Sequence, residues 1–78
     1  MIIKILGSGC KKCVALADNT KAALTAANVD AEIIKITDIV DIARFGIMST
    51  PGLVIDEQVV SSGRVLSATE IAPLLKRH

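Results

Sequence analysis

The sequence predicts an α/β fold with the element order β-α-β-α-β-β-α, in which a four-stranded mixed sheet is flanked by three helices. Short β-branched runs bounded by turn residues predict the strands. A long stretch with apolar residues at helical spacing separates the first two runs and predicts a crossover helix. Such a crossover makes the first two strands parallel, whereas the two closely spaced runs near the end predict an antiparallel hairpin.

The first half of the chain predicts a strand, a long helix and a second strand. Residues 2–6 are rich in Ile and are followed by Gly7, so they predict a buried strand. Residues 11–27 contain no Gly or Pro, and Asn28 can end a helix there. Residues 31–36 predict the second strand. The apolar or small residues that recur at helical spacing in the long helix are Leu16, Thr20, Ala23, Leu24 and Ala27.

The second half predicts a short helix followed by a hairpin. Asp38 is a good N-cap for a helix over residues 39–45. The runs 53–55 and 59–60 predict two short strands, with residues 56–58 between them as the turn. No Gly in this turn supplies the positive φ that tight hairpin turns favour.

A last helix is predicted from the capping box Ser67-x-x-Glu70. Pro73 lies inside this segment, where it removes a backbone hydrogen bond. We therefore expect this helix either to be kinked or to start later than the capping box. Because the strands carry apolar residues on both faces, the helices must cover both faces of the sheet.

Length and composition favour a single domain over residues 1–78. Nine basic and eight acidic residues leave a net charge of +1, which indicates neither a nucleic-acid-binding nor a membrane-binding protein. No segment reaches the roughly 18 apolar residues of a membrane span, and the apolar N-terminus has no basic region typical of a signal peptide. We expect a cytoplasmic monomer, a setting in which a close cysteine pair is catalytic or metal-binding.

The motif Cys10-Lys11-Lys12-Cys13 lies where the first strand ends and the first helix begins. With Cys10 as the N-cap, Cys13 follows one turn later, and the two sulfurs can meet at disulfide distance. The positive end of the helix dipole stabilises a thiolate at Cys10, and Lys11 and Lys12 add positive charge that tunes it. Cys13 is expected to be more buried. The spacing therefore predicts that Cys10 attacks a disulfide and that Cys13 resolves the product.

Two other interpretations of the cysteine pair remain open. The cysteines could be buried and inert. They could also bind a metal, although two thiolates do not complete a tetrahedral zinc site and a homodimer would have to supply four. Gly7 and Gly9, which precede the motif, are interpreted as keeping the approach to Cys10 open.

The chain resembles the thioredoxin superfamily, and within it the small redox-active disulfide protein 2 branch. Besides the cysteine motif, the resemblance rests on Thr50-Pro51 just before the third predicted strand. It covers essentially the whole chain. The other stretches that carry it are Gly7-Ser8-Gly9, Thr37-Asp38-Ile39, Gly46-Ile47-Met48-Ser49, Leu53-Val54-Ile55-Asp56 and Val59-Val60-Ser61-Ser62-Gly63-Arg64.

The resemblance implies a thiol–disulfide oxidoreductase that works through a mixed disulfide. Cys10 and Cys13 would be the catalytic pair, with no cofactor beyond their own disulfide and no metal. Thr50 and Pro51, joined by a cis peptide bond and lying against the cysteine pair, would form a substrate-docking edge lined by Gly63. The partners would be a thioredoxin-reductase-type electron donor and protein substrates with disulfides.

The sequence departs from the larger thioredoxins at several positions. Gly9 stands in place of a Trp, and Lys11-Lys12 in place of Gly-Pro. Lys4 occupies the position, six residues before the first cysteine, where larger thioredoxins carry a buried acid.

The alternative function is a soft-metal carrier that uses the same two cysteines. A heavy-metal-associated domain also places C-x-x-C between its first strand and first helix, but its element order is β-α-β-β-α-β. Thr50-Pro51 and a capped final helix favour the oxidoreductase. Zinc or copper retained by the reduced protein after dialysis would favour the carrier.

Overall fold

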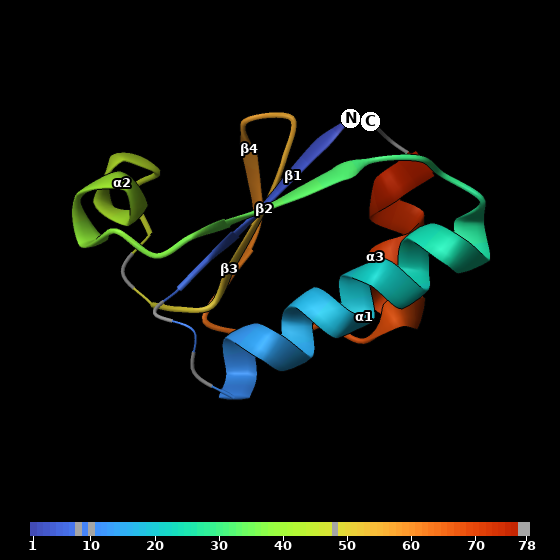
Figure 1. The fold of residues 1–78 in the computed structure, drawn as a ribbon, viewed down its shortest axis with the longest axis horizontal. Helices are drawn as coiled ribbons and strands as arrows, with labels where there is room; N and C mark the ends of the chain where they lie inside the picture. Colours follow the sequence, from blue (N-terminus) through green and yellow to red (C-terminus); the bar gives the residue numbers. More distant parts are fainter. Residues whose placement is uncertain (8, 10, 48, 77–78) are drawn as a thin grey trace.

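A computed structural model of the protein describes residues 1–7, 9, 11–47 and 49–76. The elements follow one another in the predicted order β-α-β-α-β-β-α (Figure 1). They are β1 (Ile2–Leu6), α1 (Lys11–Ala27), β2 (Glu32–Ile36), α2 (Ile39–Arg44), β3 (Gly52–Ile55), β4 (Gln58–Ser62) and α3 (Ala68–Lys76).

The four strands form one mixed sheet in the order β2-β1-β3-β4. β1 pairs with β2 in parallel, and β3 is antiparallel to both β1 and β4. α1 and α3 lie side by side on one face of the sheet, whereas α2 lies on the other (Figure 1). The predicted fold class is therefore confirmed. No helix in the described part of the chain has the length and apolar character needed to cross a membrane.

The main core lies between the sheet and the α1–α3 pair. It is built from the strand residues that point toward these helices and from the apolar stripe of each helix. The predicted stripe of α1 is buried at four positions, and Thr20 within it donates a hydrogen bond from Oγ1 to the Leu16 carbonyl at 2.7 Å. The buried side chains of this core include Ile3, Ile5, Leu16, Ala17, Leu53, Ile55, Leu66, Ile71 and Leu75.

The hairpin turn between β3 and β4 is made by Asp56 and Glu57, which have φ angles of 48° and 69°. Positive φ costs non-glycine residues about 1 kcal/mol or more. The turn is held by β1: the backbone N–H of Ile2 donates to Asp56 Oδ1 at 2.9 Å, and Lys4 forms an ion pair with Glu57. These tertiary contacts thus stabilise the positive φ angles that a glycine would have adopted without strain.

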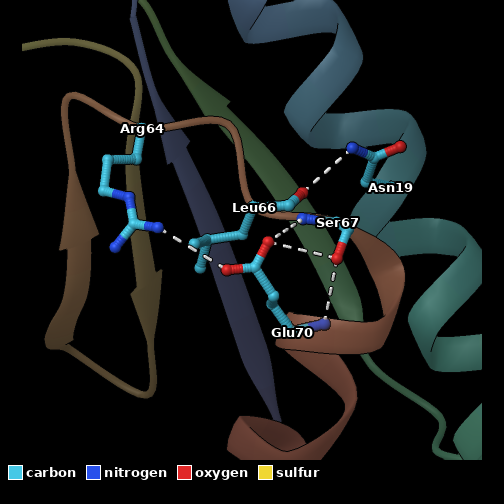
Figure 2. Close-up of polar contacts among 5 residues, drawn as sticks. All are labelled: Asn19, Arg64, Leu66, Ser67 and Glu70. Atoms are coloured by element: carbon cyan, nitrogen blue, oxygen red, sulfur yellow. Dashed lines mark hydrogen bonds and ion pairs between the residues drawn. The ribbon is translucent and has the colours of Figure 1, made fainter.

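The link from β4 to α3 is fixed by the predicted capping box (Figure 2). The backbone N–H of Glu70 donates to Ser67 Oγ, and the backbone N–H of Ser67 donates to Glu70 Oε1, each at 3.2 Å. Arg64 lies 3.6 Å from the other oxygen of the Glu70 carboxylate. On the far side of the loop, Asn19 Nδ2 donates to the Leu66 carbonyl at 2.9 Å and ties the loop to α1.

α3 begins where the capping box predicts and continues through Pro73 to Lys76. The expectation that Pro73 delays the start of the helix is wrong. Ile71 and Leu75, which are 0% and 2% exposed, anchor the helix to the core before and after the proline. This burial outweighs the lost backbone hydrogen bond, so the helix continues.

We expect Glu70 to make the stability of the protein sensitive to acid. Its hydrogen bonds with Ser67, assisted by Arg64, hold the pKa of the Glu70 carboxyl below its ordinary value. The stabilisation is present above the ordinary pKa and is lost as the pH falls through the lowered pKa of the folded state. Urea unfolding at a series of acidic pH values measures it. Glu70→Gln keeps an acceptor for Ser67 but does not titrate, so its stability should fall less steeply; identical profiles would contradict the assignment.

Candidate functional site

The predicted cysteine motif lies at the junction between β1 and α1. β1 ends at Leu6 and α1 begins at Lys11. Cys10 is outside the described residues. Cys13 is the third residue of α1 and is 5% exposed. Lys11 and Lys12 are exposed in the first turn of the same helix, which leaves their charges in solvent.

Gly7 packs directly against the sulfur of Cys13. Its backbone N–H donates to the Ile36 carbonyl at 2.9 Å, so β2 fixes its position beyond the end of β1. A Cβ atom built on Gly7 would overlap Cys13 Sγ and would lie 3.4 Å from Cys13 Cβ. Only a glycine therefore leaves room for the thiol where it now lies. Gly7 thus makes space for the Cys13 side chain. The sequence alone assigns Gly7 only to the approach to Cys10 and does not predict this role.

Thr50 lies close to Gly7. The same Cβ built on Gly7 would be 3.8 Å from Thr50 Cβ, so Cys13 and Thr50 both lie near this point. Thr50 is exposed, and none of the hydrogen bonds found in the described part of the chain uses its N–H or C=O. The Thr50–Pro51 peptide bond is cis, and the Pro51 side chain is fully buried. The exposed residue Thr50 thus lies close to the buried thiol.

Gly63 lies beside this segment at the end of β4. Its backbone N–H donates to the Pro51 carbonyl at 2.8 Å. Its φ angle is +72°, and a Cβ atom there would come within 2.9 Å of Ser49 Cβ. The structure therefore brings four of the predicted site residues, Cys13, Thr50, Pro51 and Gly63, to one end of the sheet.

A small cavity of about 30 Å³ adjoins Cys13, enough for a water molecule. It lies between α1 and the ends of β1 and β2. Lys35 is the charged residue that lines it, a position that the sequence did not single out. In the sequence, Lys35 stands out only as a lysine within the mostly apolar strand Glu-Ile-Ile-Lys-Ile. Its place near Cys13 depends on the register between β1 and β2. The lining residues are Ile5, Gly7, Gly9, Cys13, Val14, Lys35 and Thr37.

Lys4 lies on the opposite face of the sheet from Cys13. It forms an ion pair with Glu57, and its Nζ lies 5.3 Å from the centre of the Phe45 ring. Neighbouring strand residues point to opposite faces, so Ile5 reaches the cavity and Lys4 does not. Lys4 therefore has a structural role at the hairpin turn in this chain.

Within the residues that the structure describes, no three His, Cys, Asp or Glu side chains come together in a way that could hold a metal ion. Cys10 and His78 are outside those residues.

Comparisons with known proteins give one consistent family. A sequence model of the thioredoxin domain family matches residues 1–76. A thioredoxin of Methanocaldococcus jannaschii is 38% identical over 78 residues, which cover 100% of this chain and 90% of the relative. A thioredoxin of Methanothermobacter thermautotrophicus is 37% identical over 75 residues, covering 96% and 97% of the two chains.

Two solved structures share the fold at low sequence identity. One, described as the structure of a malarial protein, has a TM-score of 0.69 and 14% identity and covers 99% of this chain and 94% of its own. The other is thioredoxin-2, described as a component of malaria parasite protein secretion machinery. Its TM-score is 0.68 at 17% identity, with 99% and 82% of the chains covered. At these identities the likeness concerns the fold alone.

Proposed function

We propose, from the premise that this chain belongs to the thioredoxin family, that it exchanges a Cys10–Cys13 dithiol with disulfides of protein substrates. Family membership itself indicates a function of the thiol–disulfide oxidoreductase type. The observation that carries the more specific proposal is the position of Cys13: a buried thiol, three residues after Cys10 in the sequence, close to the exposed residue Thr50.

The proposed exchange has two steps, both thiolate attacks on a disulfide. The Cys10 thiolate attacks one sulfur of the substrate disulfide, whose S–S bond breaks as the mixed disulfide forms. The Cys13 thiolate then attacks Cys10 Sγ, which releases the second substrate sulfur as a thiolate and leaves a Cys10–Cys13 disulfide. The substrate has gained two electrons, and its thiolates take protons from water. A thioredoxin-reductase-type donor would return two electrons to the protein.

The buried state of Cys13 supports this division of roles. A thiol at 5% exposure is poorly placed to meet a disulfide in another protein, but it can attack a neighbouring sulfur in the same chain. The exposed lysines, Lys11 and Lys12, add positive charge beside Cys10 that favours its thiolate. Because both lysines are exposed, we assign them a tuning role that salt weakens.

The segment Thr50–Pro51 is the proposed docking edge. The N–H and C=O of Thr50 take part in none of the hydrogen bonds found among the described residues, and they can pair with an extended substrate segment, as a strand pairs with a sheet edge. Pro51 has no N–H to donate, and its carbonyl accepts a hydrogen bond from the Gly63 N–H. This bond holds the segment to the end of β4. A substrate held there would bring its disulfide close to the Cys10–Cys13 pair.

We expect the protein to catalyse reduction of insulin disulfides by dithiothreitol, because the dithiol can shuttle electrons between them. Cys10→Ser should lower the rate to that of dithiothreitol alone. Cys13→Ser that has been reduced, freed of dithiothreitol and then mixed with insulin should instead accumulate a mixed disulfide with insulin, visible as a mass adduct on Cys10. Turbidity from the released insulin chain and mass spectrometry measure the two outcomes.

The same experiment separates the exchanger from a metal carrier. A reduced protein that fails to accelerate insulin reduction and retains zinc or copper after dialysis would contradict the proposal. A mixed disulfide formed through Cys13 in the Cys10→Ser variant, at the rate seen with Cys10, would reverse the two roles.

A further inference from the structure

Arg64 directly follows Gly63, which places it beside the proposed docking edge at Thr50. Gly63 contacts the residues on either side of Thr50. Its N–H donates to the Pro51 carbonyl at 2.8 Å, and a Cβ atom built on it would lie 2.9 Å from Ser49 Cβ. Because neighbouring Cα atoms are about 3.8 Å apart, an extended segment paired with Thr50 passes within reach of the long Arg64 side chain.

The Arg64 guanidinium is exposed and only loosely held. Its side chain is 71% exposed and lies 3.6 Å from one oxygen of the Glu70 carboxylate, which is itself 50% exposed (Figure 2). The other Glu70 oxygen accepts hydrogen bonds from the backbone N–H and the hydroxyl of Ser67. Exposed ion pairs of this kind are weak, because water competes for both charges. A carboxylate of a bound substrate can therefore replace Glu70 as the partner of Arg64.

Among the described residues at this end of the sheet, most charges are positive. Lys11 and Lys12 are exposed in the first turn of α1, and Lys35 is exposed near the end of β2. The carboxylates of the hairpin turn and of the start of β2 lie at the opposite end of the sheet: Asp30, Glu32, Asp56 and Glu57.

The carboxylates nearer to the docking edge are engaged in other contacts or lie further along a helix. Asp38 caps α2 by accepting from the Val40 N–H at 2.8 Å, and Asp41 lies 3.9 Å from Arg44 of the same helix. Asp18 lies about two turns into α1. An acidic segment that approaches the docking edge therefore meets more positive than negative charge.

We infer that the docking edge prefers substrate segments with Asp or Glu close to the disulfide, and that Arg64 determines this preference by exchanging Glu70 for a carboxylate of the substrate. The inference rests on the proposed exchange reaction and names its substrate class: disulfides within acidic segments of proteins. Complementary charge speeds encounter and disfavours partners of the wrong charge. The preference is therefore expected in the rate at which the mixed disulfide forms.

Two synthetic peptides closed by the same disulfide test the preference. One carries a run of glutamates beside its first cysteine, and the other carries glutamines at the same positions. Oxidation of the reduced protein by excess peptide is followed by mass spectrometry as the loss of two hydrogens. At physiological salt, we expect the acidic peptide to react about three- to fivefold faster, the upper end of the effect of an exposed charge pair. Rates of both peptides with dithiothreitol correct for their intrinsic reactivity.

Variants assign the preference to the charge of Arg64. Arg64→Gln should lower the acidic-to-neutral rate ratio about threefold, whereas Arg64→Lys should keep most of it. Glu70→Gln frees Arg64 from its ion pair, so the ratio should rise, which a purely structural role of the pair does not predict. Lys21→Gln removes the same charge about 15 Å along α1 from Lys11. Because the screening length is roughly 8 Å at this salt, it should leave the ratio unchanged.

Equal corrected rates for the two peptides with the wild type, or an unchanged ratio in Arg64→Gln, would overturn the inference. Both results require that the peptides oxidise the protein, so they leave the exchange reaction standing. Failure of both peptides to oxidise the protein, together with no acceleration of insulin reduction, would contradict the proposed function and the inference with it.

Discussion

Replacing Gly7 with alanine is expected to slow formation of the Cys10–Cys13 disulfide by about 100-fold, the cost of misplacing a reacting group by about an ångström. The added methyl would overlap Cys13 Sγ, and the sulfur is the end of a short side chain, so it rotates out of its present place. Gly7 has no positive φ, so the backbone accepts alanine without strain. The rate of loss of two hydrogens after addition of oxidised glutathione, followed by mass spectrometry, measures the effect.

A double-mutant cycle tests whether the sulfur is the cause. Overpacking by Gly7→Ala should cost about 1–3 kcal/mol of unfolding free energy. Most of this cost should disappear in a Cys13→Ala background, where no sulfur occupies the space. Gly46→Ala is the matched control: it meets no atom within 4 Å but has a φ of +76°. It should lose stability through strain and keep the wild-type rate of disulfide formation. An equal cost of Gly7→Ala in both backgrounds would show that the sulfur lies elsewhere in solution.

The parts of the fold that could be predicted from the sequence are those that local patterns determine. α1 spans the predicted residues and is followed by Asn28, whose φ of 55° is the left-handed conformation expected of a helix-ending asparagine. The capping box at Ser67 and the N-cap at Asp38 form the predicted hydrogen bonds. Each of these features depends on residues within a few positions of one another, so a short stretch of sequence is enough to predict it.

The parts that could not be predicted depend on contacts between distant segments. Asp56 and Glu57 adopt positive φ because Ile2 and Lys4, from the other end of the chain, hold the turn. In the same way, Lys35 reaches the cavity beside Cys13 only through its register with β1. The sequence predicts the two strands, but not which residues of the two lie opposite each other.

The same distinction applies to the candidate site. The spacing of the cysteines predicts that Cys13 is the more buried of the two; the structure buries Cys13, and Cys10 lies outside the described residues. Its packing against Gly7 and its proximity to Thr50 depend on how β1, β2 and the segment before β3 meet at one end of the sheet. Electrostatic tuning was assigned from sequence to Lys11 and Lys12, which are adjacent to the cysteines in the chain. Lys35, which lines the same cavity as Cys13, is adjacent to it only in space.

Replacing Pro73 with alanine is expected to raise the unfolding free energy by about 2 kcal/mol. Pro73 lies inside α3, where it has no N–H to donate to the Thr69 carbonyl and where a proline costs about 3 kcal/mol. Part of this gain is offset because proline also restricts the unfolded chain, an effect of about 0.4–1 kcal/mol. Pro73 is exposed, so little packing is lost with its ring. Urea unfolding followed by circular dichroism measures the change.

A glycine at the same position gives a graded comparison. Pro73→Gly restores the N–H but has a helix propensity about 1 kcal/mol poorer than alanine. Its gain should therefore be smaller than that of Pro73→Ala by about that amount, because both variants can donate to the Thr69 carbonyl. A destabilising Pro73→Ala substitution would show that α3 does not continue through residue 73 in solution. In that case, the burial of Ile71 and Leu75 in the core would not compensate for the helix-breaking effect of Pro73.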